Sequence, residues 1–394
     1  MSVELPWILP DGVDELLPAA AARLEYLRQS LLVHFDSWGY DLVFPPLLEY
    51  VESLTVGTGH DLAIQTYQVT DHLSGRLMGF RPDMTTQVTR MDARQMQSRQ
   101  INRLCYCGSI LRARPAQIHG KRAQVQAGVE LFGHTGLESD LEILRLMLES
   151  LSVAGFSEVL LDMGHAGVIA AVLDTLQLTE TARKTLLDIL SRKSRPDLEA
   201  FLQLGAVSQE QAALCRAMLT LHGPRGILDL ALTQLMPQVP AVEAPLREMM
   251  QVADQLTALY PGLSLYFDVG ELRGLDYHTG MIFAAYAQPE GKLLAQGGRY
   301  DDVGKAFGRA RPAIGFSMDL LDLVHSAPAE PIQRLAILAP NDLDAELQAL
   351  VKQLRLAGER VITAFPGQLD TAAPGCDRQI VKRADGWIIE LIPE

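Results

Sequence analysis

Cysteine is scarce in this sequence, and the four residues present are scattered along the chain. They are Cys105, Cys107, Cys215 and Cys376 among 394 residues. This number and spacing exclude a disulfide framework of the kind that small secreted domains use in place of a large core. No second Cys or His pair stands at zinc-ligand spacing from Cys105 and Cys107. We therefore expect reduced, buried thiols, no metal site and no cofactor.

The chain also lacks long apolar runs and an excess of basic residues. No stretch of about 20 apolar residues occurs, and the N-terminus has no basic segment followed by an apolar one. The 34 Lys and Arg against 48 Asp and Glu give a net charge of −14, which disfavours a polyanionic partner. These absences predict a cytoplasmic protein that binds neither nucleic acid nor a membrane.

Hydrophobic periodicity divides the chain into helical and strand-like segments. Helical spacing predicts helices at 18–38, 85–97 and 138–154. Bulky residues between turns predict strands at 40–44, 67–69, 77–80, 104–111, 124–131, 159–163, 263–269, 281–287 and 292–296. Residues 168–259 are rich in Ala and Leu and predict a helical insertion between strands of one sheet. The expected fold class is therefore α+β.

A change of composition near residue 330 indicates a second domain. Pro328 and Pro331 mark a linker between a large domain, residues 1–327, and a small one, residues 331–394. The small domain is predicted to contain strands at 335–338 and 361–365, a helix at 343–356, and a hairpin of 379–382 and 387–391 turning at Asp385-Gly386. It reads as a small α/β domain.

Standard catalytic motifs are missing, but three local clusters carry unusual chemistry. There is no GxxxxGK[ST] loop, GxSxG elbow, HExxH helix or GxGxxG between a strand and a helix. The first cluster is Arg81-Pro82-Asp83-Met84-Thr85, where a strand gives way to a helix. Asp83 and Thr85 either cap that helix or bind a ligand, and both interpretations stay open.

The second and third clusters place polar groups and glycines on strands. In residues 124–131, Gln124, Gln126, Gly128 and Glu130 alternate with apolar residues, so one strand face either binds a ligand or faces water. The third cluster combines Arg273-Gly274-Leu275-Asp276-Tyr277-His278 with Gly297-Gly298-Arg299-Tyr300-Asp301. Its paired glycines permit close approach of a ligand, although a hairpin with surface charges gives the same pattern.

At these clusters the sequence resembles the histidyl-tRNA synthetase family, from about residue 8 to residue 325. Leu9-Pro10-Asp11-Gly12 is similar to that family's opening segment, and residues 39–49 are similar to its dimer-forming first motif. Residues 108–112 with 128–133 resemble the second motif, and the third cluster resembles two histidine-site signatures. The resemblance implies a class II synthetase-like core, an antiparallel sheet flanked by helices, and a homodimer formed through the first motif.

The third motif departs from the synthetases where ATP would bind. In that family the third motif carries a Gly, a Glu and an Arg, and the Arg holds the ATP phosphates. Here Asp322 stands at the position of that Arg, in Ala313–Asp322. A carboxylate repels a triphosphate, and the acid that follows the second-motif arginine is missing after Arg112. From residue 331 the chain has 7 Lys and Arg against 9 Asp and Glu, a poor surface for tRNA. We therefore expect no aminoacylation.

This sequence keeps a histidine site but not the ATP site. In this it is similar to the regulatory subunits of ATP phosphoribosyltransferase, a synthetase-like family of histidine biosynthesis. Asp83, where the synthetases have Glu, matches that family. The resemblance implies a non-catalytic subunit that assembles with a short-form catalytic subunit, is required for the first step of the pathway and transmits feedback inhibition by L-histidine. An active histidyl-tRNA synthetase and a stand-alone histidine sensor are the alternatives.

The resemblance also implies a histidine-binding role for nine residues. Asp83, Thr85 and Gln126 would hold the ammonium, Arg112 and Arg273 the carboxylate, Glu130 the imidazole N–H, and Tyr277 and Tyr300 the faces of the ring. His278 stands where the family has a second Tyr, and it is smaller and can titrate. We expect His278 to line the imidazole end, so that histidine affinity differs from the family's or depends on pH.

Overall fold

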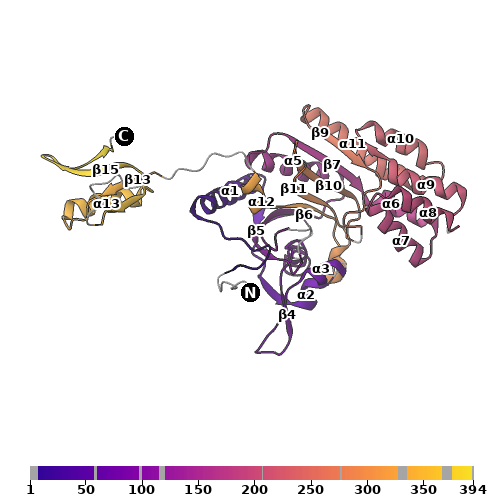
Figure 1. Cartoon of the computed structure of the whole chain (residues 1–394), viewed down its shortest axis with the longest axis horizontal. Coiled ribbons are helices and arrows are strands. Elements are labelled where there is room, and N and C mark those ends of the chain that lie inside the picture. Colours follow the sequence, from indigo (N-terminus) through magenta and orange to yellow (C-terminus); the bar gives the residue numbers. More distant parts are fainter. Residues whose placement is uncertain are drawn as a thin grey trace, which may run out of the picture. The chain divides into compact units, whose positions relative to one another are not determined.

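The chain divides into two compact units, residues 1–329 and 330–394 (Figure 1). The computed structural model describes residues 8–56, 60–96, 100–114, 120–205, 207–275, 277–326, 335–365 and 375–392. The predicted linker prolines, Pro328 and Pro331, lie outside the described residues, as do loop residues 115–119 and Asp276.

A nine-stranded sheet runs through the first unit in the order β1-β5-β6-β12-β11-β10-β7-β9-β8. Its strands are β1 (Asp41–Leu42), β5 (Asn102–Leu111), β6 (Ala123–Phe132), β7 (Val159–His165), β8 (His222–Gly223), β9 (Ser264–Asp268), β10 (Met281–Ala287), β11 (Leu293–Arg299) and β12 (Ala313–Asp319). Neighbours are antiparallel except β1 with β5 and β7 with β9. The predicted α+β class, with one sheet built from both sides of the insertion, is confirmed.

The strand predicted at 40–44 is β1, which forms an edge of the sheet, ends before Pro45-Pro46 and is shorter than predicted. Only Asp41 and Leu42 pair with β5, and the chain then meets two residues that have no N–H to donate to a ladder. The strand predicted at 292–296 is β11, which continues beyond residue 296 to Arg299. Gly297 and Gly298 are therefore strand residues, and the sheet itself carries this part of the third cluster.

Helices cover one face of the sheet and enclose the main core (Figure 1). They are α1 (Pro18–Ser37), α5 (Leu137–Val153), α11 (Glu243–Leu259) and α12 (Leu320–Ser326). Val129 and Leu131 of β6 belong to the same buried cluster as Phe35 of α1 and Leu144 of α5. Because successive side chains of a strand point to opposite faces, Gln126, Gly128 and Glu130 of β6 face away from these helices.

The insertion between β7 and β9 is helical, as predicted, apart from one short strand. Its helices are α6 (Ala166–Leu176), α7 (Glu180–Ser191), α8 (Arg195–Gln203), α9 (Gln209–Thr220), α10 (Gly226–Leu235) and α11. The start of α9 is fixed by a capping box, in which Ser208 and Gln211 each bond the other's backbone N–H. The two-residue strand β8 pairs with β9 and attaches the insertion to the sheet edge.

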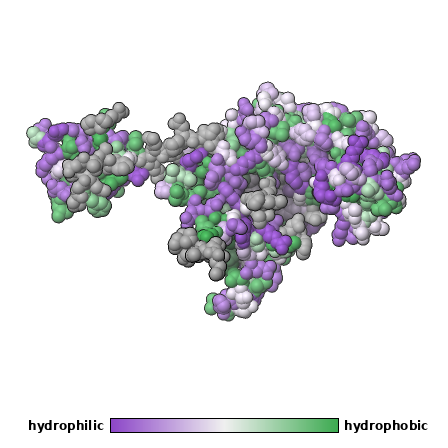
Figure 2. Space-filling view, in the orientation of Figure 1, coloured by the Kyte–Doolittle hydropathy of each residue, from purple (hydrophilic) through white to green (hydrophobic). Residues whose placement is uncertain are grey.

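A smaller three-stranded sheet lies beside the polar face of the large one. It has the order β2-β4-β3, with β2 (Leu48–Tyr50), β3 (Gln68–Thr70), β4 (Leu77–Phe80) and two short helices, α2 (Val51–Thr55) and α3 (His60–Gln65). Helices this short show too little periodicity to be predicted. The hairpin of β3 and β4 projects at the foot of Figure 1, and in Figure 2 it carries apolar residues among hydrophilic ones.

The predicted helix at 85–97 is α4 (Thr85–Met91), followed by a single π-helical turn at Asp92–Met96. Helix α4 lies against the polar side of the large sheet, where Met84 and Val88 form a second buried cluster with Tyr106 of β5. Arg90 near its end forms a bidentate pair with Glu49 of β2, at 2.6 Å for both hydrogen bonds. These contacts fix the start of α4, which carries Asp83 and Thr85, against the sheet.

In its described residues, the second unit has a four-stranded sheet of order β14-β13-β15-β16 and one helix. Its elements are β13 (Ala336–Ala339), α13 (Ala345–Leu356), β14 (Val361–Thr363), β15 (Cys376–Arg383) and β16 (Gly386–Leu391). The predicted hairpin is confirmed, with Arg383 paired to Gly386 so that the turn is Ala384-Asp385, one residue earlier than expected. Gly386 has a φ of 112°, which explains the glycine there.

Candidate functional site

The polar face of the large sheet has a floor of glycines. Glu130 of β6 stands opposite Gly315 of β12, and Gly315 stands opposite Gly298 of β11. A Cβ on Gly315 would overlap the carboxylate of Glu130, and a Cβ on Gly128 would lie 2.5 Å from the hydroxyl of Tyr106. These glycines therefore leave the polar face of β6, β11 and β12 without side chains beside Glu130. The open space above them can hold the Glu130 carboxylate and a ligand.

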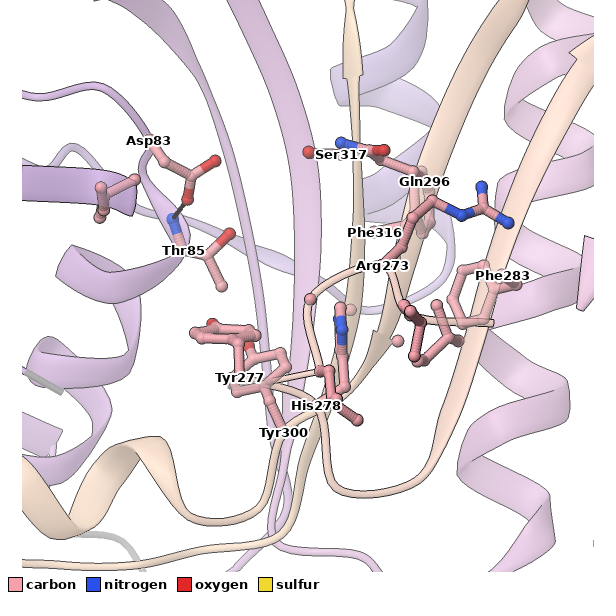
Figure 3. A pocket seen from close by; sticks show the side chains of 18 of the residues that line it. Asp83, Thr85, Arg273, Tyr277, His278, Phe283, Gln296, Tyr300, Phe316 and Ser317 are labelled. Carbon is pink, nitrogen blue, oxygen red and sulfur yellow. Dashed lines mark hydrogen bonds between the residues drawn. The ribbon is translucent and has the colours of Figure 1, made fainter. Parts of the chain in front are cut away.

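A cavity of about 590 Å³ opens over this floor (Figure 3). Seven of the nine predicted residues line it: Asp83, Thr85, Glu130, Arg273, Tyr277, His278 and Tyr300. Among its other lining residues, Phe283, Gln296 and Ser317 come from β10, β11 and β12. Its volume is in the range of small-molecule sites.

Glu130 is the most deeply buried charged group of the cavity. Its side chain is 1% exposed, and its carboxylate accepts hydrogen bonds from the hydroxyl of Tyr106, at 3.0 Å, and from that of Tyr300. Burial raises the pKa of Glu130 to about 8, although both tyrosine hydrogen bonds act in the opposite direction. The empty cavity therefore holds a carboxyl group that keeps its proton at neutral pH.

Asp83 accepts a backbone N–H at the start of α4 and also lines the cavity. Its Oδ1 accepts the backbone N–H of Thr85 at 2.7 Å, at the first residue of α4. Its Oδ2 accepts from the side-chain amide of Gln126 at 2.6 Å, and that amide's oxygen accepts the N–H of Met84 at 3.0 Å. Asp83 thus caps the helix while its carboxylate lies at the cavity wall (Figure 3).

Arg273 is held by acids on its own side of the cavity. Its guanidinium donates to Glu271 at 2.7 Å and to Asp162 of β7 at 2.6 Å, and also to the hydroxyl of Tyr286. Burial raises the pKa of Asp162 to about 6 even with Arg273 beside it. The charge of Arg273 is therefore largely balanced within the chain before any ligand arrives.

The aromatic part of the cavity is formed by Tyr277, His278 and Tyr300 (Figure 3). The rings of Tyr277 and Tyr300 have centroids 5.0 Å apart at an interplanar angle of 32°, and Tyr277 meets His278 edge to face. The hydroxyl of Tyr277 and Nδ1 of His278 are buried without a hydrogen-bond partner in the described part of the chain. Burial lowers the pKa of His278 to about 4, so this imidazole is neutral above pH 5.

Arg112 and Gln126 line a neighbouring cavity of about 420 Å³ instead. Arg273, Gln296 and Ser317 line both cavities and form the boundary between them. The Nε of Arg112 donates to the carbonyl of Pro82 at 3.2 Å, one residue before Asp83. The nine predicted residues are thus close together but divided between two adjoining spaces.

Several residues of the site were not predicted from sequence. Tyr106 was missed because only the strand register, which places it directly opposite Gly128, shows that it reaches Glu130. The rim was missed as well: α3 contributes Gln65, and α7 of the insertion contributes Leu187 and Ser191. Arg299, part of a signature, lies elsewhere, in a buried pair with Asp140 at 2.6 Å.

Both units of the chain match models of known protein families. A family model described as histidyl-tRNA synthetase matches residues 12–323, and one described as the C-terminal domain of ATP phosphoribosyltransferase subunit HisZ matches residues 334–390. The chain is 45% identical to the ATP phosphoribosyltransferase regulatory subunit of Azotobacter vinelandii, over 98% of each chain, and 44% identical to that of Chromohalobacter salexigens, over 99% of each. The chain belongs to the family of ATP phosphoribosyltransferase regulatory subunits.

A solved structure extends the likeness to the fold. The crystal structure of an ATP phosphoribosyltransferase regulatory subunit/histidyl-tRNA synthetase from Bacillus halodurans is similar at a TM-score of 0.83 and 26% identity, covering 96% of this chain and 99% of that one. The predicted class II synthetase-like fold and the predicted family are both confirmed. The chain is a regulatory subunit by family, which places it in histidine biosynthesis and implies a catalytic partner. No helix of the described residues is long and apolar enough to cross a membrane.

Proposed function

We propose that the chain binds L-histidine in the larger cavity and thereby inhibits the ATP phosphoribosyltransferase catalytic subunit with which it assembles. The observation that carries the proposal is the buried carboxyl of Glu130, held by two tyrosine hydroxyls beneath the rings of Tyr277 and Tyr300. A desolvated imidazole needs a polar partner in its plane and apolar contact on its faces. Glu130 offers the polar partner, and the paired rings of Tyr277 and Tyr300, whose centroids are 5.0 Å apart, offer apolar contact on one face of the imidazole.

The remaining groups of the amino acid are assigned to the two ends of the site. The ammonium would lie at Thr85 and the carboxylate of Asp83, which Gln126 orients at 2.6 Å. The carboxylate would point toward Arg273 at the boundary of the two cavities, with Arg112 beyond it in the smaller cavity. His278 would contact the imidazole end as a neutral ring, since burial lowers its pKa to about 4.

Feedback requires that histidine binding change the activity of a site on another chain. Typical coupling free energies of about 1 to 3 kcal/mol correspond to changes of about 5- to 150-fold. The helical insertion, residues 168–259, and the basic segment from Arg114 to Arg122 are the parts that we propose for contact with the short-form catalytic subunit. Residues 115–119 of that segment lie outside the described residues.

The test is phosphoribosyl-ATP formation by a short-form catalytic subunit, with and without this chain, across a histidine titration. We expect activity to rise when the chain is added and to fall with histidine, and we expect Glu130→Ala to keep the rise and remove the fall. Glu138→Ala is the matched control, because Glu138 lies on α5, outside both proposed contact segments, and its side chain is 82% exposed. If the chain leaves activity unchanged, the partnership is wrong; if Glu130→Ala is still inhibited, the assigned pocket is wrong.

We also propose that the chain does not activate histidine with ATP. The support is Asp322 in the smaller cavity, next to a second carboxylate, Asp319, whose pKa burial and the charge of Asp322 raise to about 6. Histidine-dependent exchange between pyrophosphate and ATP measures this directly. Exchange above the background of the Glu130→Ala variant would favour the alternative of an active histidyl-tRNA synthetase. Assembly of this chain with a target other than a catalytic subunit would favour the alternative of a stand-alone histidine sensor.

A homodimer through the first-motif segment is the assembly that we propose for the chain itself. Its support is the apolar surface there: Phe44 is 74% exposed, and Leu42 and Leu47 are each more than 40% exposed. Sedimentation velocity would show a dimer for the unmodified chain and a monomer for Phe44→Asp. A dimer that persists in Phe44→Asp, or a monomeric unmodified chain, would refute this contact.

A further inference from the structure

The hydroxyl of Tyr106 lies between the two ends of the larger cavity. Tyr106 is on β5 and is fully buried, and its hydroxyl donates to Oε1 of Glu130 on β6 at 3.0 Å. The same hydroxyl lies 3.3 Å from Oγ1 of Thr85, the first residue of α4. Thr85 is at the end proposed for the ligand's ammonium, and Glu130 is at the end proposed for its imidazole. Tyr106 therefore joins the two ends by hydrogen bonds, although it does not line the cavity itself.

The directions of these two hydrogen bonds depend on each other. A hydroxyl has a single proton to donate, and its lone pairs can accept further hydrogen bonds. When Tyr106 donates its proton to Glu130, the hydrogen bond between Thr85 and Tyr106 must be donated by Thr85. The lone pairs of Oγ1 of Thr85 are then left to accept from a group in the cavity. An ammonium fits this arrangement, because it has only protons to donate.

The empty cavity also permits the opposite direction. Burial raises the pKa of Glu130 to about 8, so the carboxyl keeps its proton at neutral pH and can donate it to Tyr106. Tyr106 would then donate to Thr85, and the proton of Thr85 would be free to point into the cavity, where it opposes an ammonium. An imidazole at Glu130 removes this second direction, because the proton that the two groups share lies between them. Tyr106 then donates to Glu130.

We propose that Tyr106 is a positioning residue that couples the two ends of the larger cavity: an imidazole bound at Glu130 fixes Thr85 as the acceptor for the ammonium of the same ligand. The inference rests on the proposed binding of histidine and adds the ligand specificity of that site. The two ligand groups then bind cooperatively. The chain therefore discriminates against imidazole compounds without an amine more strongly than the contact with Thr85 alone would allow.

The hydroxyl of Tyr300 provides the internal comparison. It donates to the other oxygen of Glu130, Oε2, and no hydrogen bond joins it to Thr85 in the part of the chain that the structure describes. Tyr106 and Tyr300 thus make the same kind of contact with one carboxyl, but only Tyr106 continues to the ammonium end. Removing either hydroxyl should weaken imidazole binding, and only the loss of the Tyr106 hydroxyl should uncouple the two ends.

The test is a double-mutant cycle on the binding of L-histidine to the full-length chain. Isothermal titration gives the dissociation constants of the unmodified chain, Thr85→Val, Tyr106→Phe and the double variant. We expect the double variant to bind at least about threefold more tightly than the product of the two single effects predicts, since both substitutions break the same chain of hydrogen bonds. Tyr300→Phe is the matched control, and its effect should multiply with that of Thr85→Val within error.

A ligand without the amine separates coupling from direct contact. Imidazolepropionate has the ring and the carboxylate of histidine but no ammonium. Thr85→Val should weaken its binding by about twofold, because Tyr106 loses the hydroxyl that supports its hydrogen bond to Glu130, and Thr85→Ser should restore it. Thermal unfolding checks the fold of each variant, and if Tyr106→Phe does not fold, this comparison decides alone.

The possible results separate this inference from the proposed function. Multiplicative effects of Thr85→Val and Tyr106→Phe, or imidazolepropionate binding that is unchanged in Thr85→Val, would overturn the coupling and leave histidine binding in place. A cycle with Tyr300→Phe that is as far from multiplicative as the cycle with Tyr106→Phe would also overturn it. If the unmodified chain does not bind histidine, the proposed function is wrong and this inference is wrong with it.

Discussion

Raising the pH from 7 to 9 is expected to weaken histidine binding by about tenfold more in the unmodified chain than in Glu130→Gln. The reason is the proton that Glu130 carries in the empty cavity. Burial between Tyr106 and Tyr300 raises the pKa of this carboxyl to about 8, so it is protonated at pH 7 and ionised at pH 9. A bound imidazole and Glu130 together need one proton, which either partner can hold.

The sign follows from counting protons in the free and bound states. Between about pH 6.5 and the pKa of Glu130, free histidine has a neutral imidazole and the cavity supplies the one proton, so affinity is constant. Above pH 8 the complex must take up a proton from solvent, and affinity falls by about tenfold, or about 1.4 kcal/mol, for each further pH unit. Below about pH 6.5 the free imidazole is charged as well, one proton is released on binding, and affinity falls again.

Isothermal titration at pH 7, 8 and 9, in buffers of different ionisation enthalpy, measures both the affinity and the protons taken up. The ammonium of histidine also titrates in alkaline solution, and Glu130→Gln serves as the reference because it keeps that effect and loses the carboxyl. We expect the unmodified chain to take up close to one proton per histidine more than Glu130→Gln at pH 9, and close to the same number at pH 7. An equal alkaline fall in both proteins, or no proton uptake at pH 9 in the unmodified chain, would refute the reasoning.

Three further predictions follow from single contacts. Gly315→Ala should cost about 1 to 3 kcal/mol of unfolding free energy in urea and abolish histidine binding, because its Cβ overlaps the Glu130 carboxylate; unchanged binding would show that the floor is not filled as described. Arg299→Ala should destabilise the fold by about 3 to 5 kcal/mol, since it leaves Asp140 buried without its partner, and a thermal shift within error would contradict that role. His278→Ala should weaken histidine binding equally at pH 6 and pH 8, because burial lowers the pKa of His278 to about 4; untouched binding would remove His278 from the site.

The sequence predicted the elements that carry the site better than the contacts within it. Alternation along residues 124–131 correctly predicted a strand with one polar face, because Val129 and Leu131 belong to the main core and Glu130 faces the cavity. The motifs predicted which distant segments would meet, and seven of the nine residues they gave line one cavity. The sequence pattern could not show that Arg112 and Gln126 line the smaller cavity instead, on the other side of a boundary. That boundary depends on side-chain positions at Arg273, Gln296 and Ser317.

Charge on a signature residue was also a poor guide to where that residue points. Arg299 and Tyr300 are adjacent in one glycine-rich string, yet Tyr300 reaches Glu130 while Arg299 is buried with Asp140 of α5. Tyr300 follows the last residue of β11, and its N–H still donates to the carbonyl of Ala313. The alternation of side chains therefore continues, and only one of the two residues faces the cavity. The extension of β11 to Arg299 decides this, and the sequence had ended that strand three residues earlier, at Gln296.

Register explains why Tyr106 escaped prediction although its partner strand was assigned well. A slip of one residue in β6 would turn Glu130 and Gln126 into the main core and expose Val129, so the face that β6 presents is strongly determined by its own sequence. No such constraint on β6 alone says which residue of β5 stands opposite Gly128. Tyr106 reaches Glu130 because Gly128 has no side chain to block its hydroxyl, and this depends on two residues 22 positions apart being aligned across the ladder. The hydrogen bond that Glu130 accepts from Tyr106 is therefore a property of the paired strands and not of either strand's sequence.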